Sequence, residues 1–321
     1  MPPRYRHPLH ERYPVIIGPT AGGKTALAVE VALLLGGEVV SADSMLLYRG
    51  LDIGSAKPTT EERRGVPHHL IDVADPADRF TVSDWLAAAN TTIGDIQARG
   101  RLPVVVGGTH LYIKALLDGL FDGPGADPAL RAELQARDPA SLRAELERID
   151  PVAAARLHPN DLRRTIRAIE VYRLTGTPIS AHQKQWDAPP LNAGPVLIGI
   201  EWPTEAVNRR INARVRAMME RGLEAEARAL WASGRIGPQA AEALGYKQLF
   251  AHFRGECSYE EAVERIKIET RRFAKNQRTW ARRLRTTPGA VWIDAAVEPN
   301  ERWAETVAAG LHHATSPPAS L

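Results

Sequence analysis

Cysteine, aromatic residues and long apolar runs are all scarce in this sequence, and each shortage excludes a class of protein. The single cysteine, Cys257, cannot form a disulfide within the chain, which excludes a disulfide-stabilised secreted scaffold. No stretch approaches the roughly 18 consecutive apolar residues of a membrane helix, so we expect no membrane partner. Aromatic residues make up only 6% of the chain, which argues against base stacking on a bare sheet. A net charge of +3 identifies no partner by itself, so the location of the positive charges matters more.

Apolar residues, by contrast, make up 44% of the 321 residues, enough for a large core in one domain that can carry an insertion. Short β-rich runs recur along the chain, as in strands buried on both faces of a parallel sheet. They occupy Val15–Ile17, Glu38–Ala42, Pro103–Gly107, Val196–Trp202 and Ala290–Asp294. Helical patterns separate most of them. We therefore predict an α/β fold, an open parallel sheet flanked by helices as in P-loop NTPases.

The stretch between residues 124 and 190 departs from this alternation, because its patterns are helical throughout and proline-rich segments flank it. We predict an all-helical insertion domain at 124–190 within an α/β core formed by 14–123 and 191–311. The ends of the chain, 1–13 and 312–321, are predicted to be a flexible leader and tail. The leader contains no apolar segment of the kind found in a signal peptide.

The segment 18–25, GPTAGGKT, follows the first predicted strand and opens a predicted helix. In this context a GxxxxGK[ST] loop wraps its backbone N–H groups around phosphate oxygens at the helix N-terminus. Lys24 would add a positive charge, and the hydroxyl of Thr25 could reach a Mg²⁺ ion. A plain glycine-rich turn is the alternative, and the combination of strand, loop and helix argues against it.

The acidic residue that organises Mg²⁺ in an NTPase is hard to find here, because the strand at 103–107 is followed by no carboxylate. The best-placed acid is Asp43, at the end of the second predicted strand. Since the carboxyl ends of parallel strands meet at one edge of a sheet, Asp43, Ser44 and Thr109 should converge on the phosphate loop. Asp43 is then either a turn or N-cap residue, or a carboxylate that binds metal or removes a proton from a nucleophile.

A strongly basic helix is predicted at 265–285, where nine Lys and Arg residues accompany one Glu. At helical spacing one face is apolar and should pack on the protein; its members are Ile266, Phe273, Trp280 and Leu284. The opposite face, here called the cationic ridge, consists of Arg271, Lys275, Arg278 and Arg282. A solvated face usually mixes both signs of charge, so contact with a nucleic-acid backbone is the better interpretation.

Together these motifs resemble the tRNA dimethylallyltransferases, also called tRNA isopentenyltransferases. The matching stretches follow the family's order over roughly residues 14 to 295. They include GPTAGGKT, ADSMLLYRGLDIGSAKP, GGTHLY, RAIEVYRLTG, ALGYKQ and TRRFAKNQRTWARRLR. The phosphate loop alone would be weak evidence, whereas its combination with the next two stretches is highly specific. Eukaryotic members often carry a zinc finger, for which one cysteine is too few, so the chain resembles the bacterial type.

This resemblance implies that the loop holds dimethylallyl diphosphate rather than ATP, and that the acceptor is the N6 amine of the adenosine 3′ of the anticodon. By resemblance, Asp43 takes a proton from that amine, and Thr109 and Lys24 complete the catalytic set. The implied donor-binding residues are Gly18, Thr20, Ala21, Gly22, Gly23, Lys24, Thr25 and Arg214, with Mg²⁺ on Thr25. An ordinary exposed arginine is the alternative for Arg214. We expect a cytoplasmic monomer.

The resemblance also implies a surface for the anticodon stem-loop of tRNA, whose target base must be turned out of its stack. The residues implied around the base are Asp43, Ser44, Met45, Leu46 and Thr109. Those implied along the stem-loop are Arg131, Arg163, Arg164, Arg167, Gly245, Tyr246, Lys247, Lys275, Arg278 and Arg282. For Arg131 and Tyr246 a purely structural role is an equal alternative.

Two other functions are alternatives to prenyl transfer. A small-molecule or nucleotide kinase would use the same loop for ATP, but it leaves the basic helix unexplained. A non-catalytic RNA-binding module with a vestigial loop would have no need to keep Lys24, Thr25 and Asp43 together.

Overall fold

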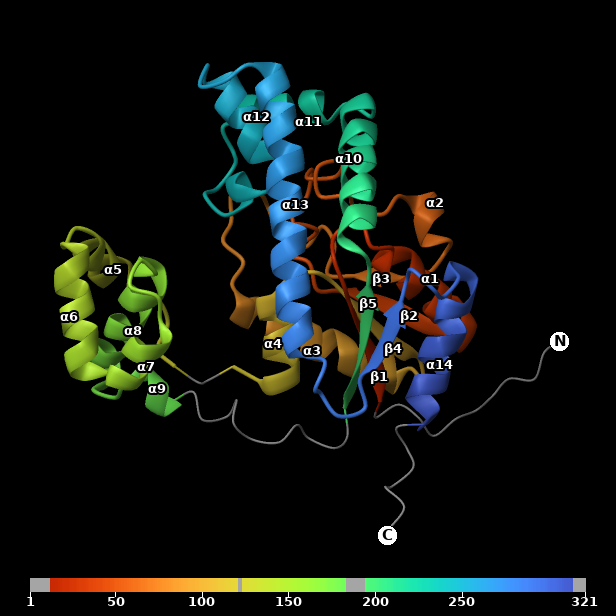
Figure 1. The fold of residues 1–321 in the computed structure, drawn as a ribbon, viewed down its shortest axis with the longest axis horizontal. Helices are drawn as coiled ribbons and strands as arrows, with labels where there is room; N and C mark the ends of the chain where they lie inside the picture. The colour runs from red at the N-terminus through yellow and green to blue at the C-terminus, as the bar shows by residue number, and fades with distance from the viewer. Residues whose placement is uncertain (1–11, 121–122, 183–193, 314–321) are drawn as a thin grey trace, which may run out of the picture. The chain divides into compact units, whose positions relative to one another are not determined.

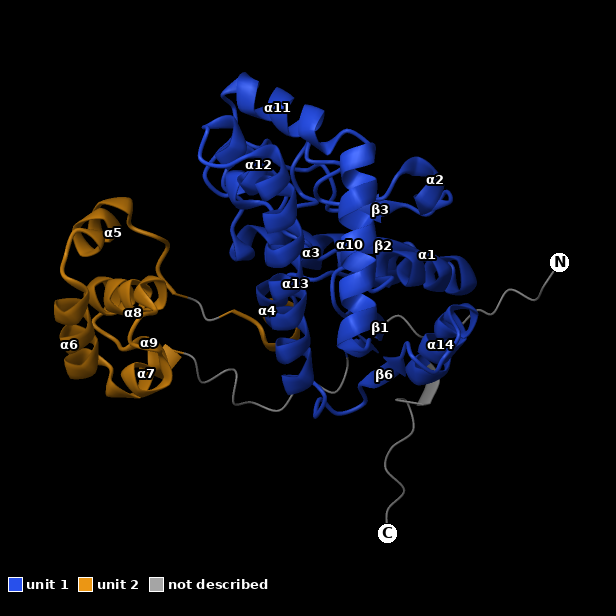
Figure 2. Cartoon of the chain, turned by 45° about the horizontal axis from the view of Figure 1, so that its top comes forward, with its two compact units in different colours: residues 1–114, 192–321 blue, residues 115–191 orange. Residues whose placement is uncertain are grey.

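The computed structural model describes residues 12–120, 123–182 and 194–313, and the chain divides into two compact units (Figures 1 and 2). Unit 1 comprises residues 1–114 and 192–321, and unit 2 comprises residues 115–191. Most of the predicted leader and tail lies outside the described residues. Tyr13, however, is the first residue of strand β1, so the predicted leader is one residue too long. Residues 312 and 313 end helix α14, so the predicted tail begins two residues too early.

Within the described residues, unit 1 is built on a six-stranded sheet in which every strand pairing is parallel. The strands are β1 (Tyr13–Ile17), β2 (Gly37–Ser41), β3 (His68–His69), β4 (Leu102–Val106), β5 (Pro195–Glu201) and β6 (Val291–Asp294). Their order across the sheet is β3-β2-β4-β1-β5-β6. Val15 of the central β1 lies between Val105 and Leu197 of its neighbours, and all three are almost fully buried. The predicted parallel α/β fold is confirmed, and β3 is the one strand it did not include.

Helices flank this sheet in unit 1 (Figure 1). They are α1 (Lys24–Leu35), α2 (Thr60–Arg63), α3 (Val82–Ala98), α4 (His110–Asp118), α10 (Thr204–Glu220), α11 (Leu223–Ser233), α12 (Tyr246–Phe253), α13 (Tyr259–Arg283) and α14 (Trp303–His313). Helix α4 begins in unit 1, and its residues from Ala115 onward belong to unit 2. The long helices α10 and α13 pack against each other. No helix in the described part of the chain combines the length and apolar character that a membrane crossing requires.

Unit 2 contains α5 (Pro128–Gln135), α6 (Pro139–Ile149), α7 (Pro151–Arg156), α8 (Leu162–Thr175) and α9 (Ile179–His182). An aspartate caps each of the first four helices by accepting backbone N–H groups of the first turn, and proline opens three of them. Their apolar sides form a core of their own around Leu142, Leu146 and Ile169. The predicted insertion, 124–190, lies within this unit.

Candidate active site

The phosphate loop connects β1 to α1 and bends around Lys24. Gly23 has a φ of 89°, a left-handed conformation that favours glycine, and it caps the N-terminus of α1. The ammonium of Lys24 donates hydrogen bonds to the carbonyls of Gly18 (3.0 Å) and Pro19 (2.8 Å). An ammonium has three N–H donors, so one remains for an oxygen of a bound anion.

The charge of Lys24 depends on Asp43, which follows β2, and on Arg214 within α10. Burial lowers the pKa of Lys24 from 10.5 to about 8, the carboxylate of Asp43 acts to raise it, and the guanidinium of Arg214 acts to lower it further. Burial and the nearby Arg210 likewise lower the pKa of Arg214. The phosphate loop, Asp43 and Arg214 therefore share one electrostatic environment, in which a bound anion would stabilise two crowded cations.

Two side chains from unit 1 support the phosphate loop from outside, and neither has a local signal in the sequence. Trp202, just after β5, donates its indole N–H to the carbonyl of Gly22 (3.0 Å), and Arg210 on α10 donates to the carbonyl of Ala21 (2.6 Å). The guanidinium of Arg210 lies over the Trp202 ring, 4.6 Å from its centroid. The loop carbonyls thus point outward to these donors, which leaves its N–H groups available for an anion.

Asp43 sits just beyond the carboxyl end of β2, as the sequence predicted, and Thr109 sits just beyond β4. The hydroxyl of Thr109 accepts the backbone N–H of Ser44 (2.9 Å) and donates to its side-chain oxygen (3.2 Å). Asp43 Oδ1 accepts the backbone N–H of Met45 (2.9 Å), which fixes the carboxylate in the turn that follows β2. Within the described residues Oδ2 has no hydrogen-bond partner, so it can accept a proton from a substrate.

Helix α13 reaches the same place with two residues that the sequence analysis did not assign to the site. Gln277 is 2% exposed, accepts the backbone N–H of Thr20 (2.7 Å) and donates to the carbonyl of Gly108 (3.1 Å). One turn later Trp280 stacks on His110, with ring centroids 4.5 Å apart. Burial, with a smaller effect of Lys24, lowers the pKa of His110 to about 4, so this imidazole is neutral at pH 7.

This arrangement matches known proteins over most of the chain. The model of the IPP transferase family matches residues 46–284, and that of isopentenyl transferases matches residues 12–74. A tRNA dimethylallyltransferase of Thermomicrobium roseum is 46% identical over 92% of both chains. The chain belongs to the IPP transferase family.

Solved structures agree with this assignment. A tRNA isopentenylpyrophosphate transferase from Bacillus halodurans is 40% identical, with a TM-score of 0.70, over 95% of this chain and 98% of that one. A eukaryotic dimethylallyltransferase described as acting on tRNA is 28% identical, with a TM-score of 0.80, over 93% of this chain and 77% of that one. The resemblance inferred from the motifs is thus confirmed for the chain as a whole.

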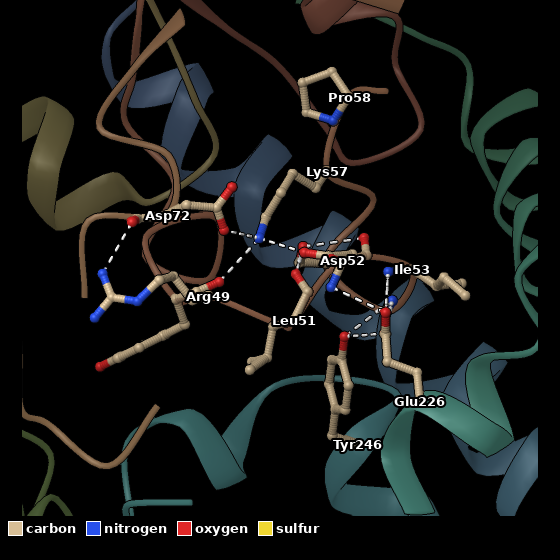
Figure 3. Close-up of polar contacts among 12 residues, drawn as sticks. Arg49, Leu51, Asp52, Ile53, Lys57, Pro58, Asp72, Glu226 and Tyr246 are labelled. Carbon is tan, nitrogen blue, oxygen red and sulfur yellow. Dashed lines mark hydrogen bonds and ion pairs between the residues drawn. The ribbon is translucent and has the colours of Figure 1, made fainter. Parts of the chain in front are cut away.

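One family motif, LDIGSAKP at residues 51–58, is held in place by the buried ammonium of Lys57 and by the carboxylate of Glu226 (Figure 3). The ammonium of Lys57 contacts Asp52 and Asp72, each at 2.5 Å, and donates to the carbonyl of Tyr48 at 2.9 Å. Glu226 on α11 accepts three successive backbone N–H groups of the same motif, those of residues 52, 53 and 54, at 2.9 to 3.2 Å. We therefore assign this IPP transferase motif a structural role beside the site.

Tyr246 belongs to that structural cluster, which corrects one predicted tRNA contact. Its side chain is fully buried, and its hydroxyl donates to Glu226 at 2.5 Å (Figure 3). Burial, together with that carboxylate, raises the pKa of Tyr246. The side chain is therefore not accessible to RNA, and neither is Gly245, which is buried at the start of α12. Lys247 is exposed and pairs with Glu242 at 2.7 Å, and its predicted RNA contact stays a prediction.

Arg131 and Arg167 in unit 2 also have a structural role. Both bind the carboxylate of Glu170, which is fully buried: Arg131 with two hydrogen bonds of 2.8 and 2.9 Å, and Arg167 with one of 2.6 Å. Burial would raise the pKa of Glu170, but the two guanidiniums hold it below its ordinary value. An unpaired buried carboxylate is costly, so these arginines are committed to it. Arg163 and Arg164 are exposed at the start of α8, where the predicted RNA contact stays a prediction.

The predicted faces of α13 need correction as well. Ile266 is buried as predicted, whereas Phe273, placed on the same face, is 40% exposed, because the helix packs through Ala262, Ala274 and Gln277 as well as Ile266. On the cationic ridge, Arg271 donates to Asn212 (2.7 Å) and Arg278 donates to Thr204 (2.6 Å), both on α10. Lys275 and Arg282 are exposed. The ridge is thus divided into two arginines that join helices and two cations open to a partner.

Proposed function

We propose that this enzyme transfers the dimethylallyl group of dimethylallyl diphosphate to the N6 amine of the adenosine 3′ of the anticodon in tRNA. In this step the C–N bond forms, the bond between the allylic carbon and the diphosphate oxygen breaks, and the amine loses one proton. The observation that carries the proposal is the Asp43 carboxylate, fixed by Met45 and set in the same electrostatic environment as Lys24 of the phosphate loop.

Each group at the site has a distinct task in this step. Lys24, Arg214 and the loop N–H groups would hold the diphosphate and stabilise the charge that it gains on leaving. Asp43 would accept the amine proton, which activates a nucleophile whose lone pair is delocalised into the adenine ring. Thr109 would hold Ser44, and with it the turn Ser44–Leu46, where the flipped base is expected.

A magnesium ion fits the oxygen donors that the site offers. Thr25, the second residue of α1, is exposed beside Lys24, and its hydroxyl is a suitable ligand for a hard cation. The described residues contain no cluster of three His, Cys, Asp or Glu side chains that could hold a metal ion. Diphosphate oxygens and water would therefore supply most ligands, and bound Mg²⁺ would neutralise charge on the leaving diphosphate.

The site draws its loop, its carboxylate and its supporting side chains from a single chain, so we propose that the enzyme acts as a monomer. We also propose that it works in the cytoplasm, the compartment that suits a tRNA substrate and a single reduced cysteine.

Transfer of label from an isotopically labelled allylic diphosphate to a synthetic anticodon stem-loop tests the function. The protein should label a stem-loop with adenosine 3′ of the anticodon, and it should leave one with inosine there unlabelled, because inosine lacks the N6 amine. A kinase would instead transfer the γ-phosphoryl group of ATP, and an RNA-binding module would bind the stem-loop without labelling it. Either result would contradict the proposal.

The division of the cationic ridge leads to a prediction about salt dependence. Replacing Lys275 and Arg282 by alanine together should weaken stem-loop binding and reduce the slope of log Kd against log salt by about 2, or about 1 per lost phosphate contact. Replacing Arg271 or Arg278 should change the slope less, because these arginines are bonded to α10.

Arg101→Ala is the control for the loss of one charge, and it is compared with Lys275→Ala and with Arg282→Ala made singly. Arg101 precedes β4 and so lies at the amino end of the sheet, away from the phosphate loop. Fluorescence anisotropy with a labelled stem-loop over a range of salt concentrations gives the slopes. If Lys275→Ala and Arg282→Ala have no more effect than Arg101→Ala, the exposed part of the ridge does not face RNA.

A further inference from the structure

Gln277 joins two loops of the site with one buried side chain. Its carboxamide oxygen accepts the N–H of Thr20 in the phosphate loop, and its nitrogen donates to the carbonyl of Gly108 in the loop after β4. A carboxamide carries a donor and an acceptor on one rigid plane, so a single side chain can satisfy a backbone N–H and a backbone carbonyl at once. The residues joined lie 257 and 169 positions away in the sequence.

The contact is too tight for a side chain at position 108. A Cβ on Gly108 would overlap the carboxamide nitrogen of Gln277, and it would lie 3.9 Å from the ammonium of Lys24. The absence of a side chain at Gly108 therefore lets the amide sit between the two loops, close to the phosphate-binding lysine. The stacking of Trp280 on His110 fixes the next turn of α13 to the same loop.

Through Gly108 the carboxamide connects the donor side of the site to the acceptor side. Gly108 immediately precedes Thr109, whose hydroxyl binds Ser44, the residue next to Asp43. The exposed cations Lys275 and Arg282 lie within two turns of Gln277 on the same helix. One helix therefore carries both the amide between the loops and the cations proposed to meet RNA.

We propose, on the basis of the function proposed above, that Gln277 is a positioning residue for the transfer step. It sets the distance between the loop that holds the diphosphate and the carboxylate that accepts the proton. It does so without touching either substrate, through the backbone of Thr20 and Gly108. Small errors in the placement of reacting groups reduce rates strongly, so loss of this bridge affects turnover as well as stability.

Gln277→Met tests the proposal, because methionine keeps the length, the apolar stem and the helix propensity of glutamine but makes neither hydrogen bond. Gln239→Met is the matched control. Gln239 also bridges a backbone N–H (3.3 Å) and a carbonyl (2.9 Å), both of Phe80, which precedes α3. The measurements are kcat and KM for dimethylallyl diphosphate, the Kd of the stem-loop, and the thermal unfolding midpoint.

We expect Gln277→Met to lower kcat/KM for the donor by about 10- to 100-fold, with part of the loss in kcat. Stem-loop binding should stay close to that of the wild type. Gln239→Met should show a similar shift in unfolding temperature and wild-type kinetics. If both variants lose stability and both keep wild-type kcat and kcat/KM, then Gln277 is only structural and the proposal is wrong.

A second experiment tests the proposal even if Gln277→Met does not fold. In Gly108→Ala the added methyl group overlaps the carboxamide of Gln277 and displaces it, so kcat/KM for the donor should also fall. In the Gln277→Ala background, which removes the overlapping amide, Gly108→Ala should cause little further loss. Fully additive effects would show that the two positions act separately. The wild-type protein is included in each assay to separate the proposed function from the role of Gln277. An inactive wild type would contradict the proposed function, whereas an active wild type with unaffected variants would contradict only the role of Gln277.

Discussion

Replacing Asp43 by alanine is expected to lower the rate of prenyl transfer by about 10²- to 10⁴-fold, the range typical for loss of a general base. The amine of adenine must lose a proton as the new C–N bond forms, and Asp43 is the carboxylate that the structure places beyond β2 beside Lys24. Single-turnover experiments with saturating donor and stem-loop measure this step directly. Stem-loop binding should persist, because the cations proposed to meet RNA lie on α13.

Asp43→Asn separates the chemistry from the structure of the turn. Asparagine can still accept the N–H of Met45 through its side-chain oxygen, so the turn after β2 should be preserved. It cannot take a proton, and its rate should be as low as that of the alanine variant. Asp75→Asn is a matched control, because Asp75 also accepts a backbone N–H two residues on, that of Ala77 at 3.0 Å. An Asp43→Asn enzyme with nearly the wild-type rate would remove Asp43 from the proton transfer.

The parts of this site that the sequence predicts are those whose signals are local. The phosphate loop is one continuous motif between a strand and a helix, and Asp43 follows the apolar run of β2 directly. Parallel strands place their carboxyl ends at one edge, so the meeting of Asp43 and Thr109 needed no knowledge of tertiary contacts. Strand β3 was missed because it consists of His68 and His69, which carry no apolar pattern.

The remaining parts depend on contacts between distant segments, which periodicity does not encode. Trp202 and Arg210 support the phosphate loop from 180 and 189 positions away, and Gln277 does so from 257 positions away. The only sign of Gln277 is an uncharged polar residue within a run of cations. Phe273 was misplaced because helical spacing selects the most apolar stripe, whereas α13 packs closely through small residues such as Ala274.

Replacing Lys24 by alanine is expected to cost about 10²- to 10³-fold in kcat, comparable to the loss of one preorganised group that stabilises transition-state charge. As the allylic carbon–oxygen bond breaks, the diphosphate gains negative charge, and the ammonium of Lys24 is held in the loop to meet it. The effect should appear in single-turnover rates at saturating donor as well as in donor affinity. Unchanged chemistry with weaker binding alone would limit Lys24 to ground-state binding.

The lowered pKa of Lys24 adds a pH dependence whose sign can be worked out. Its pKa is about 8 rather than 10.5, chiefly because of burial, so the ammonium is present below pH 8 and is lost above it. The pH profile of kcat/KM reports ionisations of the free enzyme, so kcat/KM for the donor should fall about tenfold per unit above pH 8. Bound diphosphate stabilises the ammonium, so the fall in kcat should begin at higher pH.

Lys24→Arg distinguishes this ionisation from any other on the alkaline side. A guanidinium keeps its charge across this range, so the fall in kcat/KM above pH 8 should disappear, even though the larger group fits the loop less well and lowers the rate at every pH. A fall that remains at the same pH in the arginine variant would belong to another group. Loss of the fall in the arginine variant would assign the alkaline ionisation of the transfer step to Lys24. Lys24 would then act on the leaving diphosphate and Asp43 on the attacking amine.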